Sequence, residues 1–120
     1  MKLTGIVIAR NEVKNITACV RSLNFCDEII LVDNGSTDGS LGLVAEWRDV
    51  NQKPVTLIHR TELHPDKHRQ ELYQLCRTEW LLALDADEIC VPDFQARAES
   101  ALAWQPKTEG FYLPRLTEIK

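Results

Sequence analysis

The sequence lacks several features that would assign it at once to a broad class of proteins. No apolar run approaches the ~20 residues of a membrane-spanning helix, and the N-terminal segment Met1 to Gly5 lacks the apolar core of a signal peptide. The basic residues are scattered and the formal net charge is −4, so no electrostatic footprint for nucleic acid is present. We therefore expect a cytoplasmic protein that does not bind nucleic acid.

Motifs for metals and phosphates are equally scarce. The four cysteines form no Cys-x-x-Cys pair and mostly adjoin apolar segments, which favours buried free thiols over disulfides or zinc ligands. Of the three histidines, His64 and His68 flank a helix start disturbed by Pro65, so ordinary surface positions are favoured over a metal site for them and for His59. Gly-x-x-x-x-Gly-Lys-Ser/Thr is absent, as is Gly-x-Gly-x-x-Gly after the first apolar run, which disfavours P-loop hydrolases and dinucleotide oxidoreductases.

What is present is an ordinary globular composition, with 44% hydrophobic and 27% charged residues in a chain of 120. Short apolar runs alternate with segments in which apolar residues recur at helical spacing. We expect strands at 3–9, 29–32, 55–58, 80–84 and 110–114, and helices at 13–23, 41–48, 66–76 and 94–102. This order predicts one α/β domain over residues 1–120, with three α/β/α layers and a mostly parallel sheet.

The run from Trp80 to Leu84 leads directly into three carboxylates within four positions, Asp85, Asp87 and Glu88. An unbroken apolar strand suits a parallel sheet, and such sheets bind ligands beyond the carboxyl ends of their strands. Two carboxylates two positions apart lean the same way if the backbone stays extended, and a hard divalent cation relieves their repulsion. The alternative is that Asp85 and Asp87 end the strand and cap the next helix.

Polar clusters also follow the first two expected strands. Asn11 either caps the following helix or faces a ligand, and Ser36, Asp38 or Ser40 could cap the helix at 41–48. The cluster from Asp33 to Ser40 is otherwise explained by local side-chain hydrogen bonds in a loop. In the parallel sheet, Asp33 and the pair Asp85 and Asp87 would lie along one edge.

A phospho-receiver domain would carry paired acids after its first strand and a lysine after its fifth. This chain has Ala9-Arg10-Asn11 and Leu113-Pro114-Arg115 there, which fits poorly. By contrast, the segments Ile6 to Glu12, Asp27 to Asp38 and Trp80 to Glu88 together resemble the family 2 glycosyltransferases of GT-A fold, in particular members that extend lipopolysaccharide cores. The resemblance covers essentially the whole chain.

The resemblance implies inverting, metal-dependent transfer of a sugar from a nucleotide-diphosphate sugar to a hydroxyl of a glycan or glycolipid acceptor. It implies a role in cell-envelope polysaccharide biosynthesis, with peripheral membrane association through the acceptor. The implied nucleotide-sugar site comprises Ala9, Arg10, Asn11, Glu12, Asp33, Gly35, Ser36, Arg69, Asp85 and Ala86. Asp33 would accept a hydrogen bond from the base imide, and Asp85 would face the ribose. Mn²⁺ or Mg²⁺ is expected at Asp85 and Asp87, with Asp87 directed at the metal.

The chain departs from the family pattern in two places. Many relatives carry Lys/Arg-Asn before the acidic strand, whereas Arg69 is followed by Gln70. The family's general base is an aspartate further downstream than this chain extends, so the catalytic residue stays unknown. We therefore expect a truncated GT-A fold that binds the donor, with a non-catalytic nucleotide-sugar-binding module as the alternative. The sheet edge from Gly110 to Leu116 predicts a homodimer.

Overall fold

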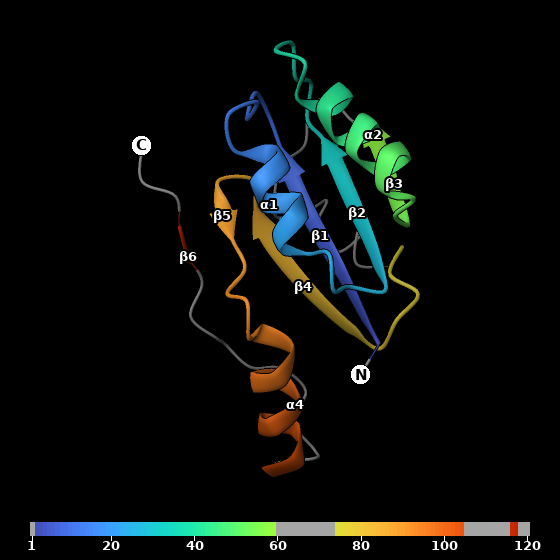
Figure 1. Cartoon of the computed structure of the whole chain (residues 1–120). Coiled ribbons are helices and arrows are strands. Elements are labelled where there is room, and N and C mark those ends of the chain that lie inside the picture. The colour runs from blue at the N-terminus through green and yellow to red at the C-terminus, as the bar shows by residue number, and fades with distance from the viewer. Residues whose placement is uncertain (1, 60–73, 105–115, 118–120) are drawn as a thin grey trace.

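The structure is a computed structural model that describes residues 2–59, 74–104 and 116–117 (Figure 1). Its elements in chain order are β1 (Leu3–Ala9), α1 (Ile16–Ser22), β2 (Glu28–Asp33), α2 (Ser40–Asn51), β3 (Val55–His59), β4 (Trp80–Asp85), β5 (Glu88–Ile89), α4 (Phe94–Trp104) and β6 (Leu116–Thr117). Within the described residues, the alternation of strands and helices that the sequence predicts is present from β1 to β3, and β4 and α4 lie where a strand and a helix are expected.

Four strands form a parallel sheet in the order β3-β2-β1-β4. The first βα unit places β2 on one side of β1, and the later strand β4 pairs with its other side. The strand order thus reverses between β1 and β4. In open α/β sheets this reversal point, at the carboxyl ends of the strands, is where ligands bind.

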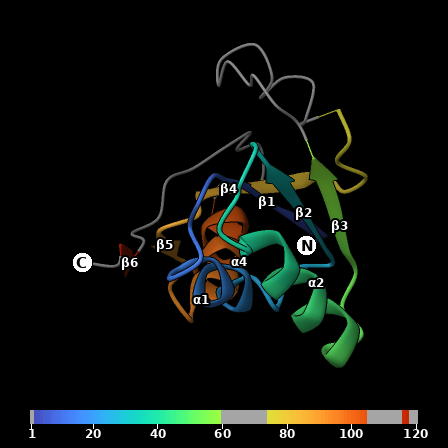
Figure 2. The same ribbon diagram turned by 90° about the horizontal axis from the view of Figure 1, so that it is seen from above.

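Side chains alternate between the two faces of the sheet. Leu3 and Val7 of β1 and Leu31 of β2 belong to a large core with residues of α1, α2 and α4, whereas Ile6 and Val32 belong to a smaller cluster on the other face. Figure 2 shows these three helices on the same side of the sheet. The parallel α/β architecture is confirmed. The helix expected at 66–76 lies mostly outside the described residues, and residues 74–75 form a turn.

The second half of the chain adds a small antiparallel ladder. Glu88 and Ile89 of β5 pair with Thr117 and Leu116 of β6. The strand expected at 110–114 and most of the edge that predicts a homodimer lie outside the described residues, so the dimer stays a prediction. No described helix is long and apolar enough to cross a membrane.

The cysteines follow the interpretation from sequence. All four are free thiols; Cys19, Cys26 and Cys90 are buried and Cys76 is half-buried. Cys19 of α1 and Cys90, the residue after β5, lie in the same core, where α1 packs against β5.

Candidate functional site

The carboxyl ends of the four parallel strands form one edge of the sheet, called here the carboxyl rim. Asp33 is the register partner of Ala9, and Asp85 is the partner of Ile8 on the other side of β1. Neighbouring strands lie ~4.8 Å apart, so the backbones at Asp33 and Asp85 are about 10 Å apart across β1. The shared edge that the sequence predicts is confirmed for these two residues, and their roles toward a ligand stay predictions.

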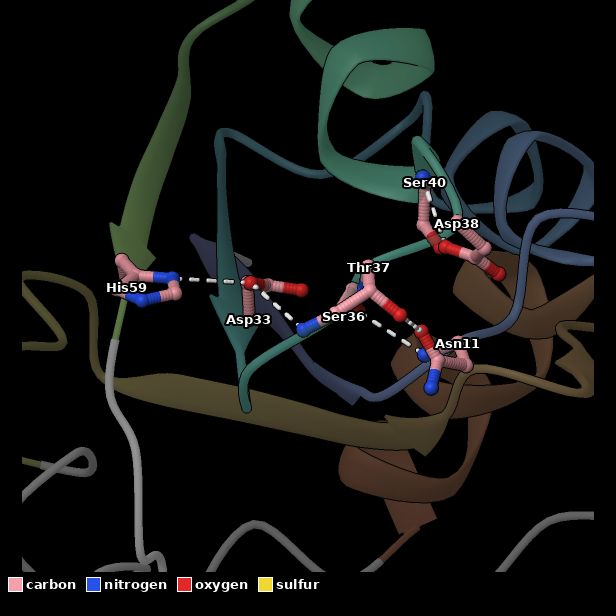
Figure 3. Close-up of polar contacts among 7 residues, drawn as sticks. All are labelled: Asn11, Asp33, Ser36, Thr37, Asp38, Ser40 and His59. Atoms are coloured by element: carbon pink, nitrogen blue, oxygen red, sulfur yellow. Dashed lines mark hydrogen bonds and ion pairs between the residues drawn. The ribbon is translucent and has the colours of Figure 1, made fainter.

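Asp33 is a buried carboxylate, 2% exposed, at the end of β2. Its Oδ2 accepts a hydrogen bond from the backbone N–H of Ser36 at 3.3 Å and lies 3.0 Å from Nδ1 of His59, the last residue of β3 (Figure 3). The surface position that the sequence favours for His59 is present, since its side chain is 60% exposed, but the contact with Asp33 is additional. The signal in the sequence was that His59 ends the apolar run that follows, along the chain, the run ending in Asp33.

Two loops of the carboxyl rim, residues 10–15 and 34–39, are hydrogen-bonded to each other and are called here the joined loops. Oγ of Ser36 accepts from the backbone N–H of Asn11 at 2.9 Å, and Oδ1 of Asn11 accepts from the backbone N–H of Thr37 at 2.8 Å (Figure 3). Oδ2 of Asp38 accepts from the backbone N–H of Val13 at 3.0 Å. Residues 25 or 26 positions apart therefore fix one another's backbone.

These contacts correct the helix caps suggested by the sequence. α1 starts at Ile16 with Asn15 as its N-cap, so Asn11 is not the cap of this helix. α2 is preceded by Gly39, in the left-handed conformation with φ 88°, so none of the three residues suggested from sequence is its N-cap residue. Asp38 nevertheless accepts a hydrogen bond at the start of the helix, because its Oδ1 lies 3.0 Å from the backbone nitrogen of Ser40. α1 therefore begins three residues later than the apolar spacing indicates, and α2 begins one residue earlier.

The other residues implied near the nucleotide lie in or beside the joined loops. Ala9 is buried at the end of β1, and Arg10 is exposed. The carbonyl of Glu12 accepts from the N–H groups of Asn15 and Ile16, so this residue forms the turn that starts α1. Gly35 has a positive φ of 79°, which favours glycine at this position. Arg69 lies outside the described residues.

The segment from Asp85 to Glu88, called here the acidic turn, joins β4 to β5. Asp85 is exposed, Asp87 is half-buried and Ala86 is only 3% exposed, with its side chain in the core. Residues 86–87 form a turn, so the extended backbone that would make Asp85 and Asp87 lean the same way is not present. The next helix, α4, starts at Phe94, and the helix-cap alternative for these aspartates is therefore wrong.

The thiol of Cys19 on α1 borders the acidic turn. Burial raises the pKa of this thiol to about 12, and the nearby carboxylates of Glu88, Asp87 and Asp85 add to the increase. At neutral pH the thiol is therefore protonated and can donate a hydrogen bond. Its Sγ lies 3.6 Å from the backbone oxygen of Asp85.

The donor set of the acidic turn fits a hard divalent cation. Asp85 and Asp87 offer carboxylate oxygens, the ligands that Mg²⁺ and Mn²⁺ prefer. Within the described residues there is no group of three or more side chains that could hold a metal ion. Mg²⁺ commonly uses one or two carboxylates together with substrate phosphates. The two aspartates therefore fit a metal that protein and ligand would share.

Solved structures with this fold include glycosyltransferases. Residues 1–349 of Staphylococcus aureus TarS, in complex with UDP-GlcNAc, superpose with a TM-score of 0.75 and 24% identity over 95% of this chain and 37% of that chain. Mannosyltransferase PcManGT from Pyrobaculum calidifontis, in complex with GDP-Man and Mn²⁺, gives 0.68 and 24% identity over 85% of this chain and 32% of that chain. The GT-A fold that the sequence resemblance implies is thus confirmed.

Sequence relatives agree with the fold. The lipopolysaccharide core biosynthesis glycosyltransferase LpsC of Rhizobium meliloti is 28% identical over 112 residues, which are 88% of this chain and 41% of that protein. An uncharacterized glycosyltransferase of Rickettsia bellii is 30% identical over 105 residues, 87% of this chain and 34% of that protein. The chain thus spans less than half the length of these curated relatives. The model of glycosyl transferase family 2 matches residues 4–104, and the chain belongs to this family.

Proposed function

We propose that this chain is the donor-binding part of an inverting, metal-dependent glycosyltransferase, which moves a sugar from a nucleotide-diphosphate sugar to an acceptor hydroxyl. One observation carries the proposal: Asp33 and Asp85 end strands on either side of β1 at the same carboxyl rim. A ligand that spans about 10 Å across β1 would meet both. A nucleoside with its diphosphate has that extended shape, with a polar base at one end and anionic oxygens at the other.

Asp33 is suited to recognise the base of the nucleotide through a hydrogen bond. One of its oxygens, Oδ2, is occupied by His59 and Ser36. The other oxygen, Oδ1, accepts the imide N–H of a base, and this partner offsets the free-energy cost of desolvating that oxygen. Uracil and guanine carry an N–H at this position, whereas cytosine and adenine carry an acceptor. The rest of the nucleoside contacts Ala9, Arg10, Asn11, Glu12, Gly35 and Ser36 of the joined loops and the backbone at Ala86.

The acidic turn serves the other end of the donor. Asp85 faces the ribose and shares Mn²⁺ or Mg²⁺ with Asp87 and the diphosphate. The metal supplies Lewis-acid stabilisation of the negative charge on the departing nucleoside diphosphate. Arg69 is a further candidate for the diphosphate.

The name of LpsC supports a place in cell-envelope polysaccharide biosynthesis. We infer a glycan or glycolipid acceptor, peripheral membrane association through that acceptor, and action in the cytoplasm.

Calorimetry with the 120-residue chain tests donor binding. UDP or GDP is expected to bind more tightly in the presence of Mn²⁺ than in EDTA. CDP and ADP are expected to bind more weakly than UDP and GDP. Asp87→Ala should remove the effect of Mn²⁺, while Asp33→Asn should weaken nucleotide binding about tenfold with or without metal. Asp49→Ala, at a 70% exposed carboxylate on α2, is the control. Metal dependence that survives in Asp87→Ala contradicts the proposal.

The second candidate is a non-catalytic nucleotide-sugar-binding module. Such a module would bind the donor through Asp33 and the acidic turn without activating an acceptor hydroxyl. Incubation with UDP-sugars and chromatography of the nucleotide products separates the two functions. Metal-dependent release of UDP supports the transferase, and binding without release supports the module.

A further inference from the structure

Helix α1 contacts both ends of the segment that carries the acidic turn. Near the start of this segment, Sγ of Cys19 lies 3.6 Å from the backbone oxygen of Asp85. At its end, Oγ of Ser22 lies 3.0 Å from the backbone nitrogen of Cys90. Cys19 and Ser22 are three positions apart and so share one side of the helix. Figure 1 shows α1 next to β5 in the arrangement that these contacts require.

The direction of each hydrogen bond follows from the groups involved. The protonated thiol of Cys19, which is fully buried, donates to the carbonyl of Asp85. The hydroxyl of Ser22 donates its proton to the backbone oxygen of Cys19 at 2.6 Å. Its lone pairs are then directed to the N–H of Cys90, which donates to Oγ. Cys19 and Ser22 thus form a small network with complementary roles at the two ends of the segment.

Between these two contacts the backbone has little freedom to rotate. Ala86 is 3% exposed and belongs to the core, so its methyl group faces inward. The backbone N–H of Asp85 donates to the Glu88 carboxylate at 2.9 Å, which closes the turn internally. Asp85 and Asp87 flank the buried Ala86 and are the more accessible residues. Their positions depend on a backbone that α1 holds.

We propose that Cys19 and Ser22 are positioning residues for the metal-binding carboxylates Asp85 and Asp87, acting through the backbone of the acidic turn. The inference rests on the proposed function. Outer partners of metal ligands commonly change metal affinity 10- to 100-fold when they are removed. Because Cys19 and Ser22 act through the backbone, we expect a loss near the lower limit, about tenfold. The contact between the base and Asp33, on the other side of β1, is left intact.

Titration of Mn²⁺ into the 120-residue chain with saturating UDP, followed by the electron paramagnetic resonance of free Mn²⁺, measures the metal affinity. Cys19→Ala and Ser22→Ala should each weaken Mn²⁺ binding about tenfold. UDP affinity in EDTA should change less than about twofold, because Asp33 does not depend on the acidic turn. Cys19→Ser and Ser22→Thr keep a hydroxyl at each position and should recover most of the Mn²⁺ affinity.

Matched controls separate positioning from a general loss of structure. Cys26→Ala removes another buried thiol of the same core, and Ser100→Ala removes an exposed hydroxyl on α4. Neither should change Mn²⁺ affinity. Ser22 is half-buried, so Ser22→Ala carries the test if Cys19→Ala does not fold.

The outcomes distinguish this inference from the proposed function. A wild-type chain that binds neither Mn²⁺ nor UDP overturns both. A wild-type chain that binds both, with alanine variants of unchanged Mn²⁺ affinity, overturns the positioning role alone. Equal losses of Mn²⁺ affinity and of UDP affinity in EDTA, or an equal loss in Cys26→Ala, indicate a merely structural role and also overturn it.

Discussion

The imidazole of His59 and the carboxylate of Asp33 join the ends of two neighbouring strands, with Nδ1 3.0 Å from Oδ2. The two residues are register partners at the ends of β2 and β3. The Asp33 side chain is 3% exposed, whereas that of His59 is 60% exposed. An accessible imidazole therefore orients a buried carboxylate, and it links β3 to the part of the carboxyl rim proposed to bind the base.

His59→Ala is expected to weaken UDP binding about fivefold, because Oδ2 of Asp33 loses one of its two fixed partners. The effect is limited to roughly 1 kcal/mol since the imidazole is largely exposed to solvent. Thr56→Ala, at an exposed position of the same strand, should leave the affinity unchanged. Calorimetry provides the comparison. Equal affinities of His59→Ala and wild type would show that Ser36 alone suffices to orient Asp33.

Asn11 combines an unusual backbone with a side-chain contact. Its φ is 52°, in the left-handed region, and its Oδ1 accepts from the backbone N–H of Thr37 at 2.8 Å. Asn11→Ala removes the acceptor and places a less tolerant residue in this conformation, so it should lower the free energy of unfolding by about 1–2 kcal/mol. Asn11→Gly loses only the acceptor and should be less destabilising. Urea unfolding measures both; a glycine variant less stable than the alanine variant contradicts this explanation.

The contact between Asp38 and α2 makes the joined loops sensitive to acid. The Ser40 hydroxyl hydrogen bond lowers the pKa of Asp38 below its ordinary 3.8; partial desolvation opposes this, and the N–H groups of Ser40 and Val13 assist. A carboxylate whose pKa is lowered in the folded state stabilises the fold at pH values above its ordinary pKa. This stabilisation is lost as the pH falls through the folded-state pKa. The stability difference between wild type and Asp38→Asn should therefore be full at neutral pH and shrink below pH 3.8.

Urea midpoints measured for both proteins from neutral to acid pH test this dependence. Asp49→Asn, which alters an exposed carboxylate near Arg48, is the matched control. If the stability difference between wild type and Asp38→Asn stays constant down to acid pH, the pKa of the Asp38 carboxyl is not lowered in the folded state.

The carboxyl rim could be predicted from the sequence because each of its strands has a local sequence signal. The apolar runs that become β1, β2 and β4 end in polar residues, and parallel strands bring such ends together. Asp33 and Asp85 therefore lie where their sequence context indicates. The same local signals identify α2 and α4, whose apolar residues recur at helical spacing.

Contacts between distant segments could not be predicted in this way. The pair formed by His59 and Asp33 depends on β3 lying next to β2, and sequence order alone does not determine which strands are neighbours. The contact of Asn11 with Thr37 requires both loops to be folded already. The turn at Ala86 could not be predicted from the local sequence either. Burial of the Ala86 methyl group against the core competes with continued extension of the strand, and this burial depends on the folded core.

Two glycines should respond in opposite directions to the same substitution. A Cβ added at Gly5 of β1 would lie 3.0 Å from Cδ1 of Leu23 and 3.3 Å from Sγ of Cys26, so Gly5→Ala should lower the free energy of unfolding by about 1–2 kcal/mol through overpacking. A Cβ at Gly42 of α2 would meet nothing within 4 Å. Gly42→Ala should therefore raise the free energy of unfolding by about 0.5 kcal/mol, because alanine has the better helix propensity. Urea unfolding of both variants provides the test. Stabilisation by Gly5→Ala would mean that α1 can move away from β1 at little cost, and would also weaken the case that α1 holds the acidic turn in place.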